Sequence, residues 1–249
     1  MDMKFKYYLQ IADNALILSH RLSEYCSNGP FLEEDLATTN VALDLLGLAE
    51  ATLEEAGKME GMGRSADDLA YRRPENQFFN TLLVEQPNVD FAHIIVRQFL
   101  SDAFDYCFFD SLSKSKDPFL AALSVKSIKE STYHLRRSSE WMVRLGDGTD
   151  EANRKAQKAL NTLWKFTGDM FLESDADKAM KESGIGVDLA AVRSQWIQKV
   201  KEILFMSKLN IASEEYYLYG GKEGRHSEYL GHILTEMQYL PSKYPDATW

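Results

Sequence analysis

The chain has 249 residues, of which 45% are hydrophobic and 27% charged, a composition that is ordinary for a globular protein. Its formal net charge of −10 argues against a nucleic-acid-binding protein, because the sequence offers no basic patch to neutralise phosphates. Two cysteines exclude a disulfide framework, and the sequence has no signal-peptide pattern and no apolar run of about 18 to 20 residues, so we expect a cytoplasmic chain without a membrane span.

Helical periodicity runs through the first half of the chain. Apolar or small side chains recur at steps of three and four over residues 4–26, which predicts a helix there. A proline followed by three acidic residues favours the start of a second, long helix over 31–60. The stretch ENQFFNTLLVEQ predicts a shorter helix over 75–86, stopped by a proline. Asn88 is the expected N-cap of the following helix, which extends to about residue 113.

The second half is also helical in pattern. The predicted helices span residues 118–145, 150–173, 188–208 and 226–240. Asp117-Pro118 is a strong start signal for the first of them. Either Thr149 or Asp150 caps the second, and Asp188 caps the third. The stretches between the later helices contain glycine-rich turns, and the last helix is expected to end before Pro241.

The helix lengths predict the architecture. No alternating strand pattern exceeds four residues, whereas several predicted helices approach 25 to 30 residues, a span of roughly 40 Å. Helices of this length indicate an all-α, ferritin-like long-helix bundle with additional C-terminal helices. We expect a single domain over 1–249, with the main bundle in 1–173 and further helices of 174–249 packed on it.

Several polar residues fall where the core of such a bundle should be. Asp44 lies within VALDLLGLA, and Asp102 lies within an aromatic-rich helix. In KESTYHLRRSSEW, Glu130 and His134 stand four apart and share a helix face. These residues could form a metal site, or they could form a buried hydrogen-bond and ion-pair network neutralised by arginines. The candidate arginines are Arg97, Arg136 and Arg137.

The ligand count weighs against a di-iron enzyme. Such a centre takes a Glu-x-x-His motif from each of two helices and a lone Glu from each of two others. Ser131 stands where the motif that ends at His134 would need its Glu. The literal match of Glu223 and His226 lies in a glycine-rich loop, where a ligand pair is unexpected. Hydrolase and nucleotide-binding motifs are also missing from the sequence.

Long stretches of the sequence carry a resemblance. LVEQPNVDFAHIIVRQF, YHLRRSSEWMVRLGDGT and GGKEGRHSEYLGHILTEMQYLP resemble the C subunits of bacterial phenylacetyl-CoA epoxidase, also called ring 1,2-phenylacetyl-CoA monooxygenase. The similarity continues through ADNALILSHRLSEYC and DLATTNVALDLLGLA and reaches the terminal Trp249. It implies a ferritin-like fold over nearly the whole chain.

The resemblance also implies a role and a set of partners. The chain would be a non-catalytic structural subunit of a multicomponent di-iron monooxygenase that epoxidises phenylacetyl-CoA in aerobic phenylacetate degradation. It would pair with and support a homologous catalytic A subunit that holds the di-iron centre, and it would carry no cofactor itself. A small B subunit would help to assemble the complex, and a reductase subunit would supply electrons from NADPH through FAD and an iron–sulfur centre.

The same resemblance implies that a metal site has been lost. The A subunit has a Glu where this chain has Ser131, and its Asp-Glu-Ala-Gly-His motif compares with ALDLLGLA, which puts the His position at Gly47 or Leu48. The lone Glu of its first helix falls near Ser19. The degenerate site, or buried polar network, would comprise Ser19, Asp44, Asp102, Glu130, Ser131 and His134. These side chains are expected to bond to one another or to nearby arginines, without metal.

Two further alternatives stay open. The chain could be an independent ferritin-like, metal-binding oxidoreductase that uses Asp44, Glu130 and His134, or a helical binding module unrelated to oxygenases. The partner surface is expected on the first two long helices, and the pair would bury more than roughly 2,000 Å². Lys222 and Arg225 could contact a partner or a coenzyme A phosphate, or they could form a solvated basic turn.

Overall fold

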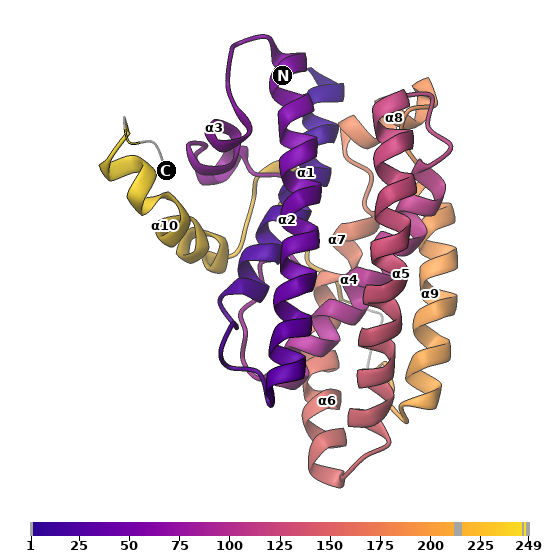
Figure 1. Cartoon of the computed structure of the whole chain (residues 1–249). Helices are drawn as coiled ribbons and strands as arrows, with labels where there is room; N and C mark the ends of the chain where they lie inside the picture. Colours follow the sequence, from indigo (N-terminus) through magenta and orange to yellow (C-terminus); the bar gives the residue numbers. More distant parts are fainter. Residues whose placement is uncertain (1, 212–215, 246, 248–249) are drawn as a thin grey trace. The chain divides into compact units, whose positions relative to one another are not determined.

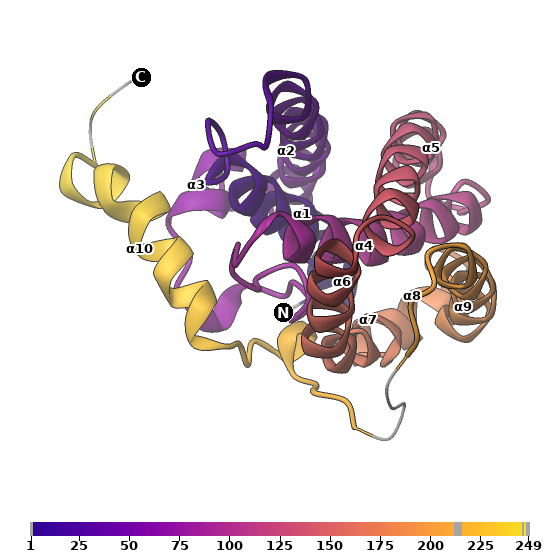
Figure 2. The same ribbon diagram turned by 90° about the horizontal axis from the view of Figure 1, so that it is seen from below.

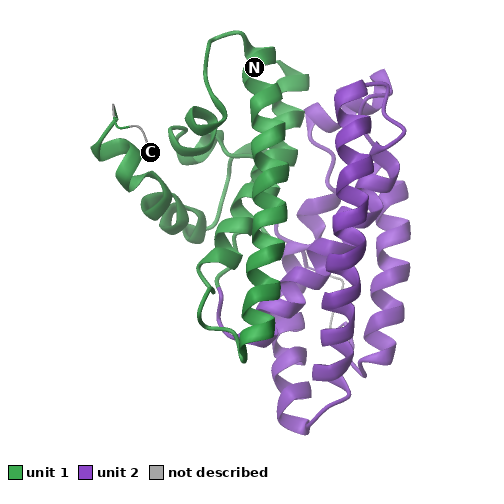
Figure 3. Cartoon of the chain, viewed as in Figure 1, with its two compact units in different colours: residues 1–87, 220–249 green, residues 88–219 purple. Residues whose placement is uncertain are grey.

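The computed structural model describes residues 2–211, 216–245 and 247, and over these ranges the chain forms helices and no β-strand. The predicted all-α fold is therefore confirmed. The chain divides into two compact units, unit 1 (Met1–Pro87 and Gly220–Trp249) and unit 2 (Asn88–Tyr219) (Figure 3). The single domain with a main bundle over 1–173 stays a prediction. Trp249, part of the resemblance noted above, lies outside the described residues.

Unit 1 is built on two long helices that pack side by side, α1 (Met3–Ser23) and α2 (Leu32–Glu60) (Figure 1). Its remaining helical segments are α3 (Ala66–Tyr71), η1 (Glu75–Gln77), η3 (Gly221–Glu223) and α10 (Glu228–Lys243). The C-terminal helix α10 contacts α1, α3 and η1, and Figure 2 shows it beside α3. Helix α1 is almost entirely buried, so it forms the centre of the unit.

Unit 2 is organised around α4 (Phe91–Leu112), whose side chains are mostly buried. Three helices pack on it: α5 (Pro118–Gly146), α6 (Asp150–Leu163) and α9 (Leu189–Met206) (Figures 1 and 2). The shorter segments are η2 (Trp164–Phe166), α7 (Gly168–Phe171) and α8 (Asp175–Ser183). Among the described helices of the two units, none is long and apolar enough to cross a membrane.

The helix starts follow local side-chain chemistry. Asp117 accepts a hydrogen bond from the backbone N–H of Phe119 at 2.9 Å at the start of α5, and Thr149 and Asp188 cap α6 and α9. These predicted caps are confirmed. The predicted Asn88 cap is wrong, because Asp90 caps α4 by accepting from the backbone N–H of residue 93 at 2.8 Å. An aspartate two residues later offers the same acceptor in the required position.

The helix predicted over 75–86 is wrong. Only the 3₁₀ turn Glu75–Gln77 forms, and the chain then continues without an α-helix to residue 90. Side chains of α1 take the backbone donors that a helix would have used. Asp13 Oδ2 accepts from the N–H of Phe79 at 2.8 Å, and Asn14 Oδ1 accepts from the N–H of Thr81 at 2.9 Å. The apolar side chains between residues 78 and 84 are buried. Because side chains of α1 hold this segment by hydrogen bonds, we call residues 72–87 the pinned loop.

Three other boundaries differ from the sequence prediction. The helix expected over 150–173 ends at Leu163 and is followed by the 3₁₀ turn η2 and the single turn α7. The mixed stretch after it contains α8, which a capping box between Ser174 and Asp177 starts. Helix α10 passes through Pro241 and ends at Lys243. A proline in the last turn removes only one hydrogen bond, and at this half-buried helix end water can satisfy the freed carbonyl.

Candidate functional site

The six residues of the predicted polar network divide between the two units. Ser19 and Asp44 belong to unit 1, and the other four belong to unit 2. Ser19 is buried on α1 and its hydroxyl donates to the carbonyl of Ala42 at 2.7 Å, so it joins α1 to α2. Asp44 is half-buried on α2. A serine bonded to a backbone carbonyl serves packing, and the degenerate position near Ser19 stays a prediction.

A buried acid–base cluster lies between α4 and α5 in unit 2. Asp102 is buried, and its Oδ1 accepts from Gln98 Nε2 at 2.6 Å. Burial raises the pKa of Asp102, although the charges of His134 and Arg137 and hydrogen bonds from Ser138 and Gln98 act in the opposite direction. Asp102, His134 and Arg137 are therefore close enough to interact electrostatically. The cluster holds a carboxylate beside an imidazole and a guanidinium, which suits a structural polar centre.

Asp105 is a second acidic residue on α4, three positions after Asp102. Burial, together with the charge of Asp102, raises the pKa of Asp105 to about 8. The side chain is therefore largely protonated at neutral pH. A protonated carboxyl is a poor ligand for iron and a poor partner for a cation, so Asp105 acts as a neutral polar group within the helix.

The remaining predicted ligands do not complete a metal centre. Glu130 is half-buried and pairs with Lys126 of its own helix at 3.6 Å, and Ser131 is buried. In the described part of the chain, no three His, Cys, Asp or Glu side chains lie together so that they could hold a metal ion. Ser131 offers no carboxylate where a di-iron motif needs one, and Asp102 and Glu130 alone do not supply its four carboxylates, so these side chains do not fit a di-iron centre. That the chain carries no cofactor stays a prediction.

The glycine-rich loop 220–224 and its surroundings differ from the solvated basic turn considered above. Lys222 is buried, so that interpretation is wrong for this residue, whereas Arg225 is exposed. Glu223 Oε2 pairs with Lys6 Nζ of α1 at 2.9 Å. Glu223 and His226 thus have separate partners and do not act as a ligand pair.

His226 is the centre of a second buried network, in unit 1. Its Nδ1 lies 2.9 Å from Glu85 Oε2 and its Nε2 lies 2.9 Å from the carbonyl oxygen of Phe78. Both neighbours are acceptors, so both ring nitrogens must donate, which requires the imidazolium. Burial lowers the pKa of His226, but the hydrogen bond and charge of Glu85 outweigh it, and the net shift raises the pKa. Ser227 N–H and Asn80 Nδ2 also donate to the Glu85 carboxylate, at 2.7 and 3.0 Å.

Comparison with known proteins identifies the family of this chain. The model of a family described as phenylacetic acid catabolic protein matches residues 1–249. The chain is 46% identical over 249 residues to the C subunit of the 1,2-phenylacetyl-CoA epoxidase of Escherichia coli (strain K12), and the match covers all of both chains. The chain belongs to the phenylacetic acid catabolic protein family. The family resemblance inferred from the sequence is thereby confirmed.

This family member holds a further buried ion pair that sequence reasoning missed. Arg73 NH1 donates to Asp13 Oδ2 at 3.1 Å, and Arg73 NH2 donates to Asp13 Oδ1. Both side chains are almost inaccessible to solvent, at 1% and 0% exposure. The Arg73 guanidinium also stacks over the Phe78 ring at 4.2 Å and donates to the carbonyl of Gln77 at 2.7 Å. The pair therefore anchors the pinned loop to α1.

Only weak sequence signals point to these networks. Asp13 is recognisable as an acid on an apolar helix, and Glu85 stands in the apolar run TLLVEQ, which is the same signal that draws attention to Asp44. Neither signal names the partner, because Arg73 and His226 lie 60 and 141 residues away in sequence. A buried acid predicts that a partner exists but not which residue it is.

The exposed face of α2 carries a row of leucines. Its exposed leucines, which we name the α2 stripe, are Leu32, Leu36, Leu43 and Leu46. The spacings of four, seven and three residues put them on one side of the helix. Leu36 and Leu43 remain 54% and 59% exposed. Exposed apolar surface that continues along a helix is a common feature of protein–protein contact sites.

Proposed function

We propose that this chain is the non-catalytic C-type subunit of a phenylacetyl-CoA epoxidase and acts in the cytoplasm in phenylacetate degradation. The observation that carries the proposal is the 46% identity to the C subunit of the Escherichia coli enzyme over the full length of both chains. The chemistry of the predicted site supports a structural role, since Asp102 accepts a hydrogen bond from Gln98 and Glu130 faces Lys126 of its own helix at 3.6 Å. The di-iron centre then belongs to a homologous A subunit, and FAD and an iron–sulfur centre belong to the reductase subunit.

The α2 stripe is the proposed contact with the A subunit. Permanent interfaces between subunits require a long apolar face that stays exposed in the single chain, because obligate interfaces are large and apolar. The first two long helices are the expected partner surface, and α2 is the second of them. The B subunit and the reductase subunit complete the proposed complex. Arg225, which is exposed at the end of the glycine-rich loop, remains available to a partner.

Charge placed in the α2 stripe should prevent assembly. We expect Leu36→Glu/Leu43→Glu to fold normally alone, because both side chains are exposed, but to bind the A subunit about a hundredfold more weakly or worse, since two carboxylates would be buried unpaired. Co-purification with a tagged A subunit, followed by sedimentation analysis, measures this. Leu240→Glu is the matched control, because Leu240 is 47% exposed on α10 outside the stripe. Undiminished assembly of the double variant would remove α2 from the proposed interface.

Iron content separates the subunit role from an independent metal enzyme. We expect the chain alone, loaded anaerobically with ferrous iron and desalted, to retain close to no iron, because no three ligand-type side chains lie together in the described part of the chain. Metal per chain is counted by mass spectrometry, with the isolated A subunit as the positive control. Retention of about two iron atoms per chain would instead support the oxidoreductase that uses Asp44, Glu130 and His134.

A further inference from the structure

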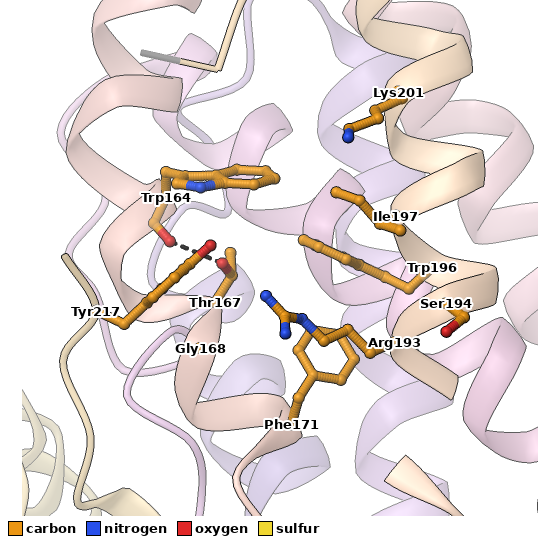
Figure 4. Close-up of a pocket in the computed structure, with 10 residues that line it drawn as sticks. All are labelled: Trp164, Thr167, Gly168, Phe171, Arg193, Ser194, Trp196, Ile197, Lys201 and Tyr217. Atoms are coloured by element: carbon orange, nitrogen blue, oxygen red, sulfur yellow. Dashed lines mark hydrogen bonds between the residues drawn. The ribbon is translucent and has the colours of Figure 1, made fainter. Parts of the chain in front are cut away.

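A cavity of about 290 Å³ lies within unit 2, between the η2–α7 segment and helix α9 (Figure 4). It is distinct from the Asp102 cluster between α4 and α5, and the proposed subunit role makes no use of it. Its wall includes four aromatic rings, those of Trp164, Phe171, Trp196 and Tyr217, together with polar and charged side chains. None of the ten lining residues that the structure describes is acidic, although the chain as a whole has a net charge of −10.

The aromatic wall is held in place by contacts from three segments. The rings of Trp164 and Trp196 stack with their centroids 5.5 Å apart, and Phe171 packs against Trp196 at 5.0 Å. The segment that carries Tyr217 is fixed to η2 by a hydrogen bond from the Leu218 N–H to the Lys165 carbonyl at 2.8 Å. These contacts give the cavity a defined shape, and such preformed aromatic pockets favour planar ligands.

A glycine lets the Tyr217 ring close this side of the cavity. A Cβ added at Gly168 would lie 2.7 Å from Tyr217 Cγ, closer than real Cβ atoms approach. Only glycine leaves room for the ring at this position. The Tyr217 ring is therefore part of the wall by close packing against α7, and Figure 4 shows it opposite the Trp196 ring.

One buried donor in the wall lacks a hydrogen-bond partner. The two stacked indoles differ, because Trp196 Nε1 donates to the carbonyl of Leu100 at 3.0 Å, whereas Trp164 Nε1 has no partner among the described residues. Trp164 is only 4% exposed. A buried N–H left unsatisfied is unfavourable, and native proteins satisfy nearly all such groups. In Figure 4 the nitrogen of Trp164 lies on the edge of the ring that faces Tyr217 and Arg193.

Two cations border the cavity from α9. Arg193 and Lys201 stand eight residues apart, about two helical turns, and both line the cavity. Figure 4 shows the Arg193 guanidinium reaching into the space between the rings of Tyr217 and Trp196. Arg193 forms no ion pair with an acid in the described ranges. A guanidinium is the preferred partner of a planar carboxylate, because the two groups form parallel hydrogen bonds.

We propose that this cavity binds a small aromatic carboxylate with a single ring. The ring would pack among Trp164, Trp196 and Tyr217, and the carboxylate would accept hydrogen bonds from the Arg193 guanidinium and the Trp164 indole N–H. The volume is at the lower end of that of ligand pockets, so it accommodates a molecule of the size of phenylacetate but not an entire coenzyme A thioester. The site belongs to this chain alone and does not depend on the proposed subunit role.

Titration of the full-length chain with phenylacetate tests the proposal. Calorimetry should show saturable binding, and phenylacetamide, which has the same shape but no charge, should bind about tenfold more weakly or worse, as the loss of a charge-assisted hydrogen bond predicts. Acetate, which lacks the ring, should also bind more weakly by a similar factor. Absence of saturable phenylacetate binding at millimolar concentration, or equal affinity for the acid and the amide, would overturn the proposal.

Variants test whether phenylacetate binds in this cavity. Arg193→Gln should weaken phenylacetate binding about tenfold, and Trp164→Phe, which keeps a ring but removes the N–H, should weaken it less. Arg136→Gln is the matched control: Arg136 is an exposed cation near the ring of Tyr133 on α5 and does not line the cavity. In ¹⁵N-correlation spectra, phenylacetate should shift the indole signal that Trp164→Phe removes and leave that of Trp141 unshifted. Equal binding by Arg193→Gln and Arg136→Gln, or no shift of the Trp164 signal, would assign the binding elsewhere.

Discussion

The Arg73→Met variant is expected to lose about 3 to 5 kcal/mol of unfolding free energy, the usual effect of breaking a buried ion pair from one side. The substitution leaves the Asp13 carboxylate buried at 0% exposure with one remaining donor among the described residues, the backbone N–H of Phe79. It also removes the hydrogen bonds from the guanidinium to the carbonyls of Leu69 and Gln77. Urea unfolding followed by circular dichroism measures the loss, and the slope of the transition shows whether the variant unfolds as one unit.

The neighbouring arginine supplies the control. Arg72 is 52% exposed and pairs with Asp68 at 3.3 Å on the surface, so Arg72→Met should cost no more than about 1 kcal/mol. The double variant Asp13→Leu/Arg73→Met should be more stable than Arg73→Met, because no unpaired charge remains buried. Equal losses for Arg72→Met and Arg73→Met would show that the buried pair does not anchor the pinned loop.

The elements that the sequence predicted correctly depend on local interactions. The starts of α5 and α9 require only an aspartate within three residues of the N–H groups that it accepts from, and Asp117 and Asp188 supply it. The long helices follow from a hydrophobic period that continues over many turns, so that small local conflicts do not alter the outcome. Such signals are complete within a few residues and can be read without knowledge of the fold.

The pinned loop could not be predicted because its structure depends on distant residues. The apolar spacing in ENQFFNTLLVEQ suits a helix, and nothing within the segment argues against one. What prevents a helix is the supply of acceptors on α1, where Asp13 and Asn14 bind the N–H groups of Phe79 and Thr81. Tertiary hydrogen bonds of this kind override local propensity, and periodicity alone cannot detect them.

The candidate sites show the same limit. Spacing on one helix put Glu130 and His134 on nearby turns, and it also allows the i,i+4 pair of Lys126 with Glu130, but it could not show that His134 would lie near Asp102 of α4. The aromatic cavity escaped sequence analysis because Trp164 and Trp196 are far apart in the chain, and only the packing of α9 against η2 brings them together. Polar and aromatic residues can be listed as candidates from sequence, but their partners follow from the fold.

The unfolding free energy of the chain is expected to decrease as pH rises above about 6.5 because of His226. Burial lowers the pKa of this histidine, but the hydrogen bond and charge of Glu85 raise it above its usual value, so the folded chain holds a proton that the unfolded chain releases. The stabilisation is fully present below the unfolded-state pKa and is lost as pH rises through the folded-state pKa. Between these two pKa values, the unfolding free energy falls by at most about 1.4 kcal/mol per pH unit.

Other groups titrate near this pH range, and their contributions to the unfolding free energy cancel when two chains are compared at the same pH. Burial and the charge of Asp102 raise the pKa of Asp105 to about 8, so the folded chain binds this proton more tightly than the unfolded chain. The contribution of Asp105 therefore also lowers the unfolding free energy as pH rises towards 8. Burial lowers the pKa of His20, so His20 reduces the unfolding free energy only as pH falls below about 6.5, which is outside the pH range in which His226 acts. Both contributions are the same in the wild-type chain and in a variant altered only at Glu85.

Glu85→Gln is that variant. The amide keeps the shape of the side chain but removes the charge that holds the imidazolium, and a neutral His226 can still donate from Nε2 to the Phe78 carbonyl. The stability gap between the wild-type chain and Glu85→Gln should be largest near pH 6 and should shrink as the pH of the urea titrations rises towards 9. His232→Gln, which changes an exposed histidine of α10 in the same unit, should show no such pH-dependent gap. A gap for Glu85→Gln that stays constant with pH would contradict the charged His226 and would remove the proposed ion pair with Glu85.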